Sequence, residues 1–469
     1  MEIKHWAATD VGRKRSHNED NFLIDKNLNL FIVADGMGGH ASGEVASAIA
    51  VHTIRDVVAA ERDLFARIAD YDGAAQMELC TLLEYAVHSA SARIYHKAQQ
   101  EPEKRGMGTT VVALLLIGQR GFIAYVGDSR IYLSRNGVVY PLTEDHSLMN
   151  ELIRSGKVRA DEFAVSPYAG FKNAMTRAVG VYEHVEVDIL DFEVLAGDAF
   201  LLCSDGLYDY LDDAEIASNL ALTNVEEIPG RFIDIANSRG GKDNVTALVV
   251  QIRGEQTAAR AAQLQFTVDT LRRVPLMAGL SYQQLCKLMN ISRVQSSRPG
   301  EVLTREGSEP GDLYVVLDGR ATLSRGGVHL VTLGAGSLLG ETDLVGADVA
   351  RLTVTAESNG KLLRIARRDL QELFRRDPAL ASKMLWTLAG ELGRRLEDTQ
   401  LQLSTALGET EEKTMIVEVS EGEPEGEGFD RTNPRAVVVI PKLTAPAAKT
   451  EPEVVEEIDE FEDVFDEPG

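Results

Sequence analysis

Short apolar runs alternate with Gly- and Asp-rich turns along the first half of this 469-residue chain. Runs with the length and composition of β-strands occupy residues 28–34, 111–117, 122–126, 200–203 and 245–252. Between them, residues 43–58 and 80–99 carry apolar positions at helical spacing. Because strands and long helices do not alternate regularly, the pattern predicts an α+β sandwich over residues 1–254 and not a βαβ fold.

The pattern changes after residue 254. An Ala- and Gln-rich stretch predicts a helical linker over 255–269. Residues 270–400 show short strands separated by Gly and Pro turns and then a return to helical spacing, which predicts a jelly-roll β domain with flanking helices. From 401 to 469, Glu, Gly and Pro dominate, a composition typical of a disordered tail.

The acidic charge of the chain is concentrated in that tail. Of the net charge of −25, residues 408–469 contribute −14, with 19 Asp and Glu against 5 Lys and Arg. We expect no nucleic-acid partner, because such proteins need basic surfaces. Three cysteines without a CxxC pair favour a reducing compartment, and neither a signal peptide nor an apolar stretch of about 20 residues is evident. The chain is therefore predicted to be cytoplasmic, with no membrane partner.

Carboxylates recur where the apolar strands end. Asp35 and Asp205 each follow a strand and precede a glycine, Asp128 follows a third strand, and Asp243 comes just before a fourth. A single Asp-Gly pair is usually a turn. Several strands of one sheet system would bring their acids to a shared rim, where carboxylates repel one another and lose hydration. A hard divalent cation removes that repulsion, and an all-oxygen set favours Mg²⁺ or Mn²⁺ over zinc.

These acids lie in motifs whose order resembles the type-2C family of metal-dependent protein serine/threonine phosphatases. The motifs are TDVG (9–12) with Arg15 and NED (18–20), ADGMGGH (34–40) with GE (43–44), GMGTT (106–110), VGDSR (126–130), LTEDHS (142–147), TRAVG (176–180), LCSDGL (202–207) and KDNVT (242–246). The match covers residues 4–252, and the ordered set is far more specific than any one motif. It implies a four-layer α-β-β-α sandwich.

The resemblance also implies roles at matched positions. Asp35 would bridge two metal ions, the carbonyl oxygen of Gly36 would bind the second, and Asp205 and Asp243 would complete the first. The expected cofactors are Mn²⁺ or Mg²⁺, two per active site with a third, weaker site. Two such ions lower the pKa of a bridging water and neutralise the phosphoryl oxygens, so the implied reaction is direct in-line attack by water without a phospho-enzyme.

Further residues complete the implied site. Glu19 and Asp20 would hold metal-bound waters, and Asp128 would serve the third metal. Arg15 would grip the substrate phosphate, because a planar guanidinium contacts two phosphate oxygens. Met37 stands where animal members often have a histidine proposed as general acid, so a metal-bound water is expected to protonate the leaving group.

Two histidines and one loop near these motifs are open to more than one interpretation. His40 and His146 are predicted to have core or turn roles and not to act as acid catalysts. Residues 148–175 occupy the position of the family's flap segment. A mobile, partly basic flap beside the metals would select phosphopeptides, and a merely variable surface loop is the alternative.

Residues 270–400 resemble cyclic-nucleotide-binding domains. The resemblance rests on VPLMAGL (274–280), PGEVL (299–303), REG (305–307), LYVVLDG (313–319) and LLGE (338–341). Gly340 and Glu341 fit the phosphate cassette, where helix amides hold the phosphate and the Glu takes the ribose hydroxyl. The expected phosphate-binding arginine is Arg351, but Ala350 stands at the usual position and Asp343 adds a negative charge. We therefore predict weak nucleotide binding and favour a domain used for protein contacts or dimerisation.

The sequence as a whole predicts an active phosphatase for phosphoserine and phosphothreonine proteins, with a bacterial kinase or its targets among the partners. Asp35, Asp205 and Arg15 would carry the reaction. The alternative is a catalytically silent phosphatase fold that serves as a scaffold or as a nucleotide-sensing module. The presence of Asp35, Asp205, Asp243 and Arg15 favours the enzyme. The tail is predicted to be a solubilising extension; the alternative is that it shields the catalytic rim or docks on a partner through residues 436–440.

Overall fold

The computed structural model describes residues 2–38, 42–69, 73–172, 174–254, 258–344 and 349–415. Residues Met1–Gln400 form one compact unit, so the two predicted domains pack together. The last helix, α12, runs over Pro378–Met415 and therefore continues past residue 401, where the tail was predicted to begin. The rest of the predicted tail lies outside the described residues. Within the described part of the chain, no helix is long and apolar enough to cross a membrane.

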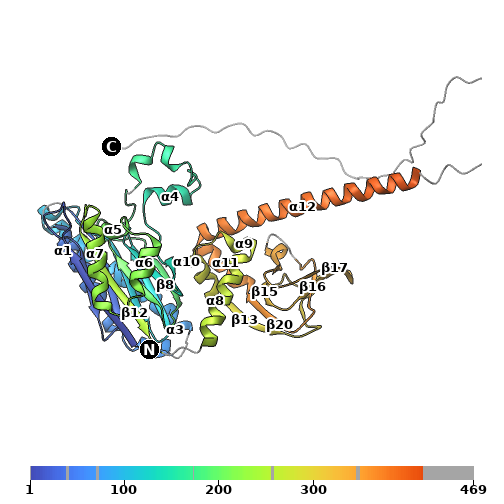
Figure 1. Cartoon of the computed structure of the whole chain (residues 1–469), viewed down its shortest axis with the longest axis horizontal. Helices are drawn as coiled ribbons and strands as arrows, with labels where there is room; N and C mark the ends of the chain where they lie inside the picture. The colour runs from blue at the N-terminus through green and yellow to red at the C-terminus, as the bar shows by residue number, and fades with distance from the viewer. Residues whose placement is uncertain are drawn as a thin grey trace, which may run out of the picture. The chain divides into compact units, whose positions relative to one another are not determined.

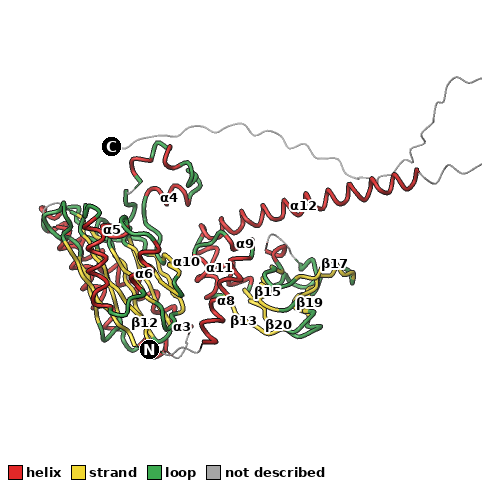
Figure 2. The backbone as a smooth tube through the Cα atoms, viewed as in Figure 1, coloured by secondary structure: helices red, strands yellow, loops and turns green. Residues whose placement is uncertain are grey.

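Two five-stranded antiparallel sheets form the centre of the first domain (Figures 1 and 2). The first sheet has the order β1 (Glu2–Asp10), β12 (Val245–Arg253), β11 (Ala199–Cys203), β8 (Arg130–Arg135), β9 (Val138–Pro141). The second sheet has the order β10 (Asp188–Glu193), β7 (Arg120–Val126), β6 (Val111–Ile117), β3 (Leu30–Ala34), β2 (Asn21–Asp25). A short ribbon pairs β4 (Gly36–Met37) with β5 (Gly108–Thr109).

Helices cover the outer face of each sheet. The second sheet packs on α1 (Ser42–Ala60), α2 (Leu64–Ala69) and α3 (Gly73–Gln100), and the first sheet packs on α5 (Asp205–Tyr208), α6 (Asp213–Leu220) and α7 (Ile228–Ser238). Between the sheets lies an apolar core that includes Phe31, Leu133 and Phe200. This arrangement confirms the predicted four-layer α-β-β-α sandwich. The remaining elements here are η1 (Pro102–Lys104), α4 (Leu148–Arg154), η2 (Phe163–Val165), η3 (Ala169–Phe171) and η4 (Val225–Glu227).

The apolar runs of the sequence are the buried strands of the sandwich. The prediction for 111–117 coincides with β6, and the other four predicted strands overlap β3, β7, β11 and β12 with small shifts at their ends. Every residue of β3, β6 and β11 is buried, because both faces of these central strands are covered. β1 was not predicted. Its residues are exposed or half-buried at a sheet edge, so it has no continuous apolar run.

The second domain is a small β sandwich, and the helices that precede and follow it in the chain pack together against one of its sheets. One sheet has the order β13 (Ser292–Ser297), β20 (Gly360–Ile365), β15 (Leu313–Asp318), β18 (Leu338–Leu339), and the other β14 (Val302–Thr304), β19 (Thr353–Ala356), β16 (Ala321–Arg325), β17 (Val328–Leu333). The helices are α8 (Ala258–Arg273), α9 (Pro275–Ala278), α10 (Tyr282–Asn290), η5 (Glu341–Leu344), α11 (Arg367–Arg376) and α12. The jelly-roll prediction is confirmed, and α8 covers most of the predicted helical linker.

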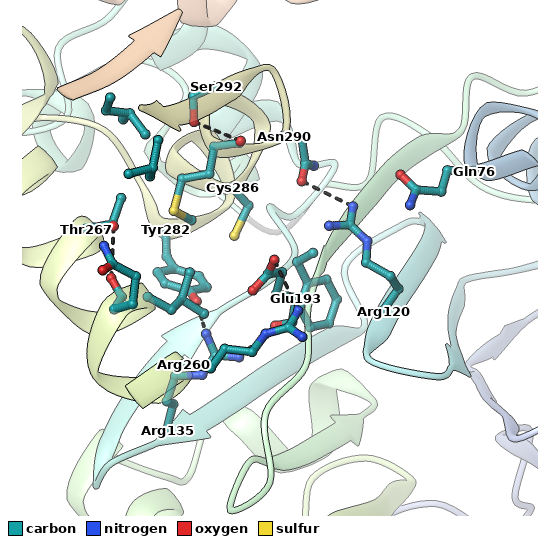
Figure 3. Close-up of a pocket in the computed structure, with 16 residues that line it drawn as sticks. Gln76, Arg120, Arg135, Glu193, Arg260, Thr267, Tyr282, Cys286, Asn290 and Ser292 are labelled. Carbon is teal, nitrogen blue, oxygen red and sulfur yellow. Dashed lines mark hydrogen bonds and ion pairs between the residues drawn. The ribbon is translucent and has the colours of Figure 1, made fainter. Parts of the chain in front are cut away.

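Helix α10 attaches the second domain to the first. Tyr282 and Cys286 of this helix are buried in the same apolar core that fills the space between the two sheets. Arg135 donates a hydrogen bond from Nη1 to Tyr282 Oη at 2.6 Å. Further along the helix, Arg120 donates to Asn290 Oδ1 at 3.2 Å beside a cavity of about 430 Å³ (Figure 3). The junction between the domains therefore combines apolar burial with directional polar contacts.

Candidate active site

The predicted rim aspartates lie at the ends of neighbouring strands. In the second sheet, Asp35 follows β3 and Asp128 lies just after β7, and these two strands run in the same direction because β6 is antiparallel to both. In the first sheet, Asp205 lies just after β11 and Asp243 just before β12. Since β11 and β12 are antiparallel neighbours, the end of one lies beside the start of the other. Each sheet thus has two acids on the side where these strands end or begin.

The acidic ends of the two sheets meet, because Ser204 after β11 donates to Asp20 before β2 at 2.7 Å, and the charges of the acids act on one another. Burial, followed by the charges of Asp20, Asp205, Asp128 and Asp243, raises the pKa of Asp35 well above its ordinary value. Burial and the charge of Asp243 raise the pKa of Asp205. Burial and the charge of Asp205 raise the pKa of Asp128 to about 7, and burial raises that of Asp20 to about 6. We call these five residues the acidic cluster.

The acidic cluster fits a divalent cation in its chemistry. Asp20 Oδ1 and Asp205 Oδ1 are buried without a hydrogen-bond partner among the described residues, although buried polar atoms are normally paired. No three His, Cys, Asp or Glu side chains of the described chain are arranged to hold an ion as they stand. Arg15 donates a hydrogen bond to Asp243. The fit to a cation therefore rests on the oxygen chemistry of the carboxylates and on these two unpaired oxygens.

Gly36 lies where no side chain can be accommodated. Its N–H donates to the Glu19 carbonyl oxygen at 3.1 Å. A Cβ atom at Gly36 would lie 2.2 Å from the carbonyl oxygen of Gly43 and 2.5 Å from that of Glu19. The backbone segments that carry Glu19 and Gly36 are therefore in direct contact beside Asp35. This close approach accounts for Gly36 in the motif ADGMGGH and for Gly43 in the motif GE.

Arg15 contacts the acidic cluster from its exposed side. Its Nη2 atom donates to Asp243 Oδ2 at 2.6 Å, and its side chain remains 53% exposed. The hydrogen bond to Asp243 raises the pKa of the guanidinium. Because an exposed ion pair contributes little to stability, the pair can exchange its carboxylate for another anion at low cost. Arg15 is thus a cation at the mouth of the site with solvent access.

Three polar residues that organise the site were not predicted. Ser204 Oγ and Thr246 Oγ1 donate to Asp20 Oδ2 at 2.7 and 2.6 Å, which holds one oxygen of this carboxylate in place. Asn244 accepts from the Glu19 N–H at 2.9 Å and donates to the carbonyl oxygens of residues 11 and 17. The only signal in the sequence was their position next to the acids of the motifs.

His146 has a structural environment, as predicted. Its Nδ1 accepts from the Gly127 N–H at 3.1 Å, and its ring stacks on Tyr125 with centroids 5.3 Å apart. It lies directly before α4, which begins the predicted flap and is capped by Ser147. The other histidine, His40, lies outside the described residues. Whether 148–175 selects substrates stays a prediction.

In the predicted nucleotide pocket, the acidic residues are bonded to other groups of the protein. Gly340 has a positive φ of 85°, and Glu341 is buried and accepts from Arg395 Nη1 of α12 at 2.6 Å. Arg351 is exposed while Ala350 is buried, which agrees with the predicted one-residue slip. Asp343 is also buried, and its Oδ2 accepts from the Gly311 N–H at 3.2 Å. The cassette glutamate is therefore already paired with a cation of the protein itself.

Known proteins resemble this chain in both halves. A family model described as protein phosphatase 2C matches residues 11–240, and one described as a cyclic nucleotide-binding domain matches residues 294–377. The serine/threonine phosphatase stp of Listeria innocua is 40% identical over 247 residues, which are 52% of this chain and 93% of the relative.

A further relative comes from Mycobacterium tuberculosis. The serine/threonine protein phosphatase PstP is 35% identical over 250 residues, 53% of this chain and 45% of the relative. A crystal structure of the PstP catalytic domain in complex with two manganese ions has a TM-score of 0.45 at 33% identity, and covers 54% of this chain and 99% of that one.

Proposed function

The chain belongs to the protein phosphatase 2C family, and we propose that it hydrolyses phosphoserine and phosphothreonine in proteins at the acidic cluster. The observation that carries this proposal is the gathering of several aspartates from both sheets, most of them half-buried, at one rim where they raise one another's pKa. A fold gains no stability from unpaired, repelling carboxylates, so such a cluster favours a ligand of opposite charge. The serine/threonine phosphatases among the relatives support the substrate class.

We assign the predicted ligand roles to the residues of this rim. Asp35, the carbonyl oxygen of Gly36, Asp205 and Asp243 would hold two Mn²⁺ or Mg²⁺ ions, and Asp128 a third. The two free oxygens of the acidic cluster and its all-oxygen donor set support this assignment. When bound, such ions neutralise phosphoryl oxygens and make water a nucleophile at neutral pH.

The chain's own residues bind and orient the substrate. Arg15 is proposed to exchange Asp243 for the substrate phosphate, because its guanidinium is exposed and offers two parallel N–H donors. Ser204 and Thr246 fix one oxygen of Asp20, which leaves the other directed away from them. Glu19 is held through its backbone by Gly36 and Asn244, so its side chain projects from an anchored segment.

The test is metal-dependent turnover by the full chain. We expect the chain to hydrolyse an aryl phosphate and a phosphothreonine peptide with Mn²⁺ and to lose this activity in EDTA. Asp205→Asn should reduce the rate at least about 100-fold, since removing a residue that merely orients a metal ligand already costs about 10- to 100-fold and Asp205 is proposed to be a ligand itself. Asp209→Asn is the matched control, because Asp209 is exposed at the end of the same short helix. Equal rates in Mn²⁺ and EDTA, or an active Asp205→Asn, would support the silent-scaffold alternative.

For the second domain we propose a role in protein contacts and not in nucleotide sensing. Glu341 is engaged by Arg395, and the adjacent buried Asp343 adds a negative charge where a phosphate would bind. Phosphorylated proteins, including a serine/threonine kinase or its targets, are the proposed partners. We further propose a cytoplasmic location, on the reasoning that Cys80, Cys203 and Cys286 are free thiols.

A further inference from the structure

A buried hydrogen bond joins the second domain to the strand that leads to Asp128. Gln283 of α10 is 7% exposed and donates from Nε2 to Tyr125 Oη at 2.9 Å. Tyr125 lies in β7, is fully buried, and precedes Asp128 by three residues. A phenol has one proton, and Gln283 occupies an acceptor position of the oxygen. The Tyr125 proton is therefore free to be donated elsewhere.

The acceptor of the Tyr125 hydroxyl is Asp188, the first residue of β10. Tyr125 Oη donates to Asp188 Oδ2 at 3.1 Å, and a carboxylate only accepts. Arg177 donates to the other oxygen, Asp188 Oδ1, at 3.2 Å. Burial raises the pKa of Asp188, but hydrogen bonding to His146 and the charge of Arg177 outweigh burial and lower it. Asp188 is thus a fixed anion that gathers donors from three segments.

His146 connects this anion to the base of the flap. The backbone N–H of Gly127 donates to Nδ1, so in the neutral ring the proton is on Nε2, which lies 3.4 Å from Asp188 Oδ2. The backbone of His146 is also bonded. Its N–H donates to the Gly127 carbonyl oxygen at 2.9 Å, and its carbonyl oxygen accepts from the backbone N–H of Thr176. Both ends of segment 148–175 are therefore tied to His146, and Gly127 directly precedes Asp128.

We propose that Gln283 is a positioning residue for the phosphatase reaction. It fixes the Tyr125 hydroxyl, and through Asp188 and His146 it sets the base of the flap. The second domain would thus contribute a hydrogen bond that positions residues around the active site, although it contributes no residue to the acidic cluster. This inference rests on the proposed function, because it concerns the same reaction.

The second domain and the flap also line one cavity. Residues of the flap base and its helix α4, including Glu144, Ile153 and Arg154, line a cavity of about 630 Å³ together with Gln283 and Trp386 of the second domain. The flap therefore lies close to the second domain, and the path from Gln283 through Tyr125, Asp188 and His146 ends at its base. A phosphopeptide, which extends beyond the phosphate, should depend on flap placement more than an aryl phosphate does.

The test replaces Gln283 by an apolar residue of the same length. Gln283→Met keeps the volume of the side chain but removes the donor, and Tyr125→Phe removes the hydroxyl while keeping the stacked ring. We expect kcat/KM for a phosphothreonine peptide to fall about three- to tenfold in each, with less than a twofold change for an aryl phosphate. Because both variants break the same link, the double variant should be no worse than the more severe single variant.

Asn290→Ala is the matched control. Asn290 lies on the same helix and joins the domains by donating to Asp191 at 2.8 Å, but it has no link to Tyr125. It should leave both activities within twofold of wild type. The proposal is overturned if Gln283→Met matches wild type on the peptide, if both substrates fall equally, or if Asn290→Ala has the same effect. If Gln283→Met does not fold, Tyr125→Phe carries the test alone. An inactive wild-type chain would instead overturn the proposed function itself.

Discussion

The buried ion pair between Arg135 and Asp198 provides a stability test of the domain junction. The two side chains are 4% and 1% exposed, and Arg135 donates to both Asp198 oxygens at 2.8 and 2.7 Å. The same guanidinium donates to Tyr282 Oη at 2.6 Å and to the Glu193 carbonyl oxygen at 2.8 Å. Removing Arg135 would leave Asp198 with one donor, the Leu195 N–H at 2.7 Å.

We expect Arg135→Met to lower the free energy of unfolding by about 3–5 kcal/mol, the cost of leaving a buried charge without its partner. Tyr282→Phe removes only the bond across the junction and should cost about 1 kcal/mol. In Arg135→Met/Asp198→Asn the charge is gone and the amide oxygen can still accept from Leu195. This double variant should therefore recover at least about 2 kcal/mol of the loss.

The assay is urea unfolding of the full chain, followed by far-ultraviolet circular dichroism. Arg325→Met is a control, because Arg325 is an exposed arginine at the end of β16. If the free energy of unfolding of Arg135→Met lay within about 1 kcal/mol of the wild-type value, the ion pair would contribute less to stability than we expect. A double variant no more stable than Arg135→Met would refute the argument that the unpaired Asp198 charge is the cause.

Three further results are expected. Arg15→Lys should raise KM for a phosphopeptide about tenfold in steady-state kinetics, because an ammonium replaces two parallel donors by one point charge; an unchanged KM would remove Arg15 from phosphate binding. Asp205→Asn should raise the free energy of unfolding in EDTA by about 1 kcal/mol, since it relieves repulsion in the acidic cluster; a loss of stability would contradict this. Millimolar cyclic AMP or cyclic GMP should not shift the melting temperature of the wild type, because Glu341 is held by Arg395. A shift in Arg395→Ala, with none in the exposed-site control Arg394→Ala, would show that this pair blocks the pocket.

Much of the fold was predictable because its central strands are buried on both faces. Such strands have continuous apolar runs, as in β6, and the turns that end them need Asp and Gly for reasons of local geometry. The position of Asp35 directly after β3 could therefore be read from the chain. Edge strands such as β1 lack this signal, since their half-exposed residues do not separate into apolar and polar sets.

The contacts that join the domains could not be predicted, because their partners are far apart in the sequence. Gln283 and Tyr125 are 158 residues apart, and Arg135 and Tyr282 are 147 apart. Neither partner has a local pattern that distinguishes a buried donor from an exposed one. The pairing of Glu341 with Arg395 is similar, because the sequence suggested only that Glu341 would face a ribose.

Asp20 shows why the acidic rim is better explained by a ligand than by folding stability. Two hydroxyl groups, from Ser204 and Thr246, satisfy one of its oxygens, while the other is buried without a partner among the described residues. An apolar residue of similar size would avoid the cost of about 1–3 kcal/mol that an unsatisfied buried oxygen carries. Donors placed on one oxygen hold the carboxylate in a single orientation and direct the other at the rim. A carboxylate oriented in this way, beside Asp35 and Asp205 with their raised pKa values, is suited to a cation and to the water around it.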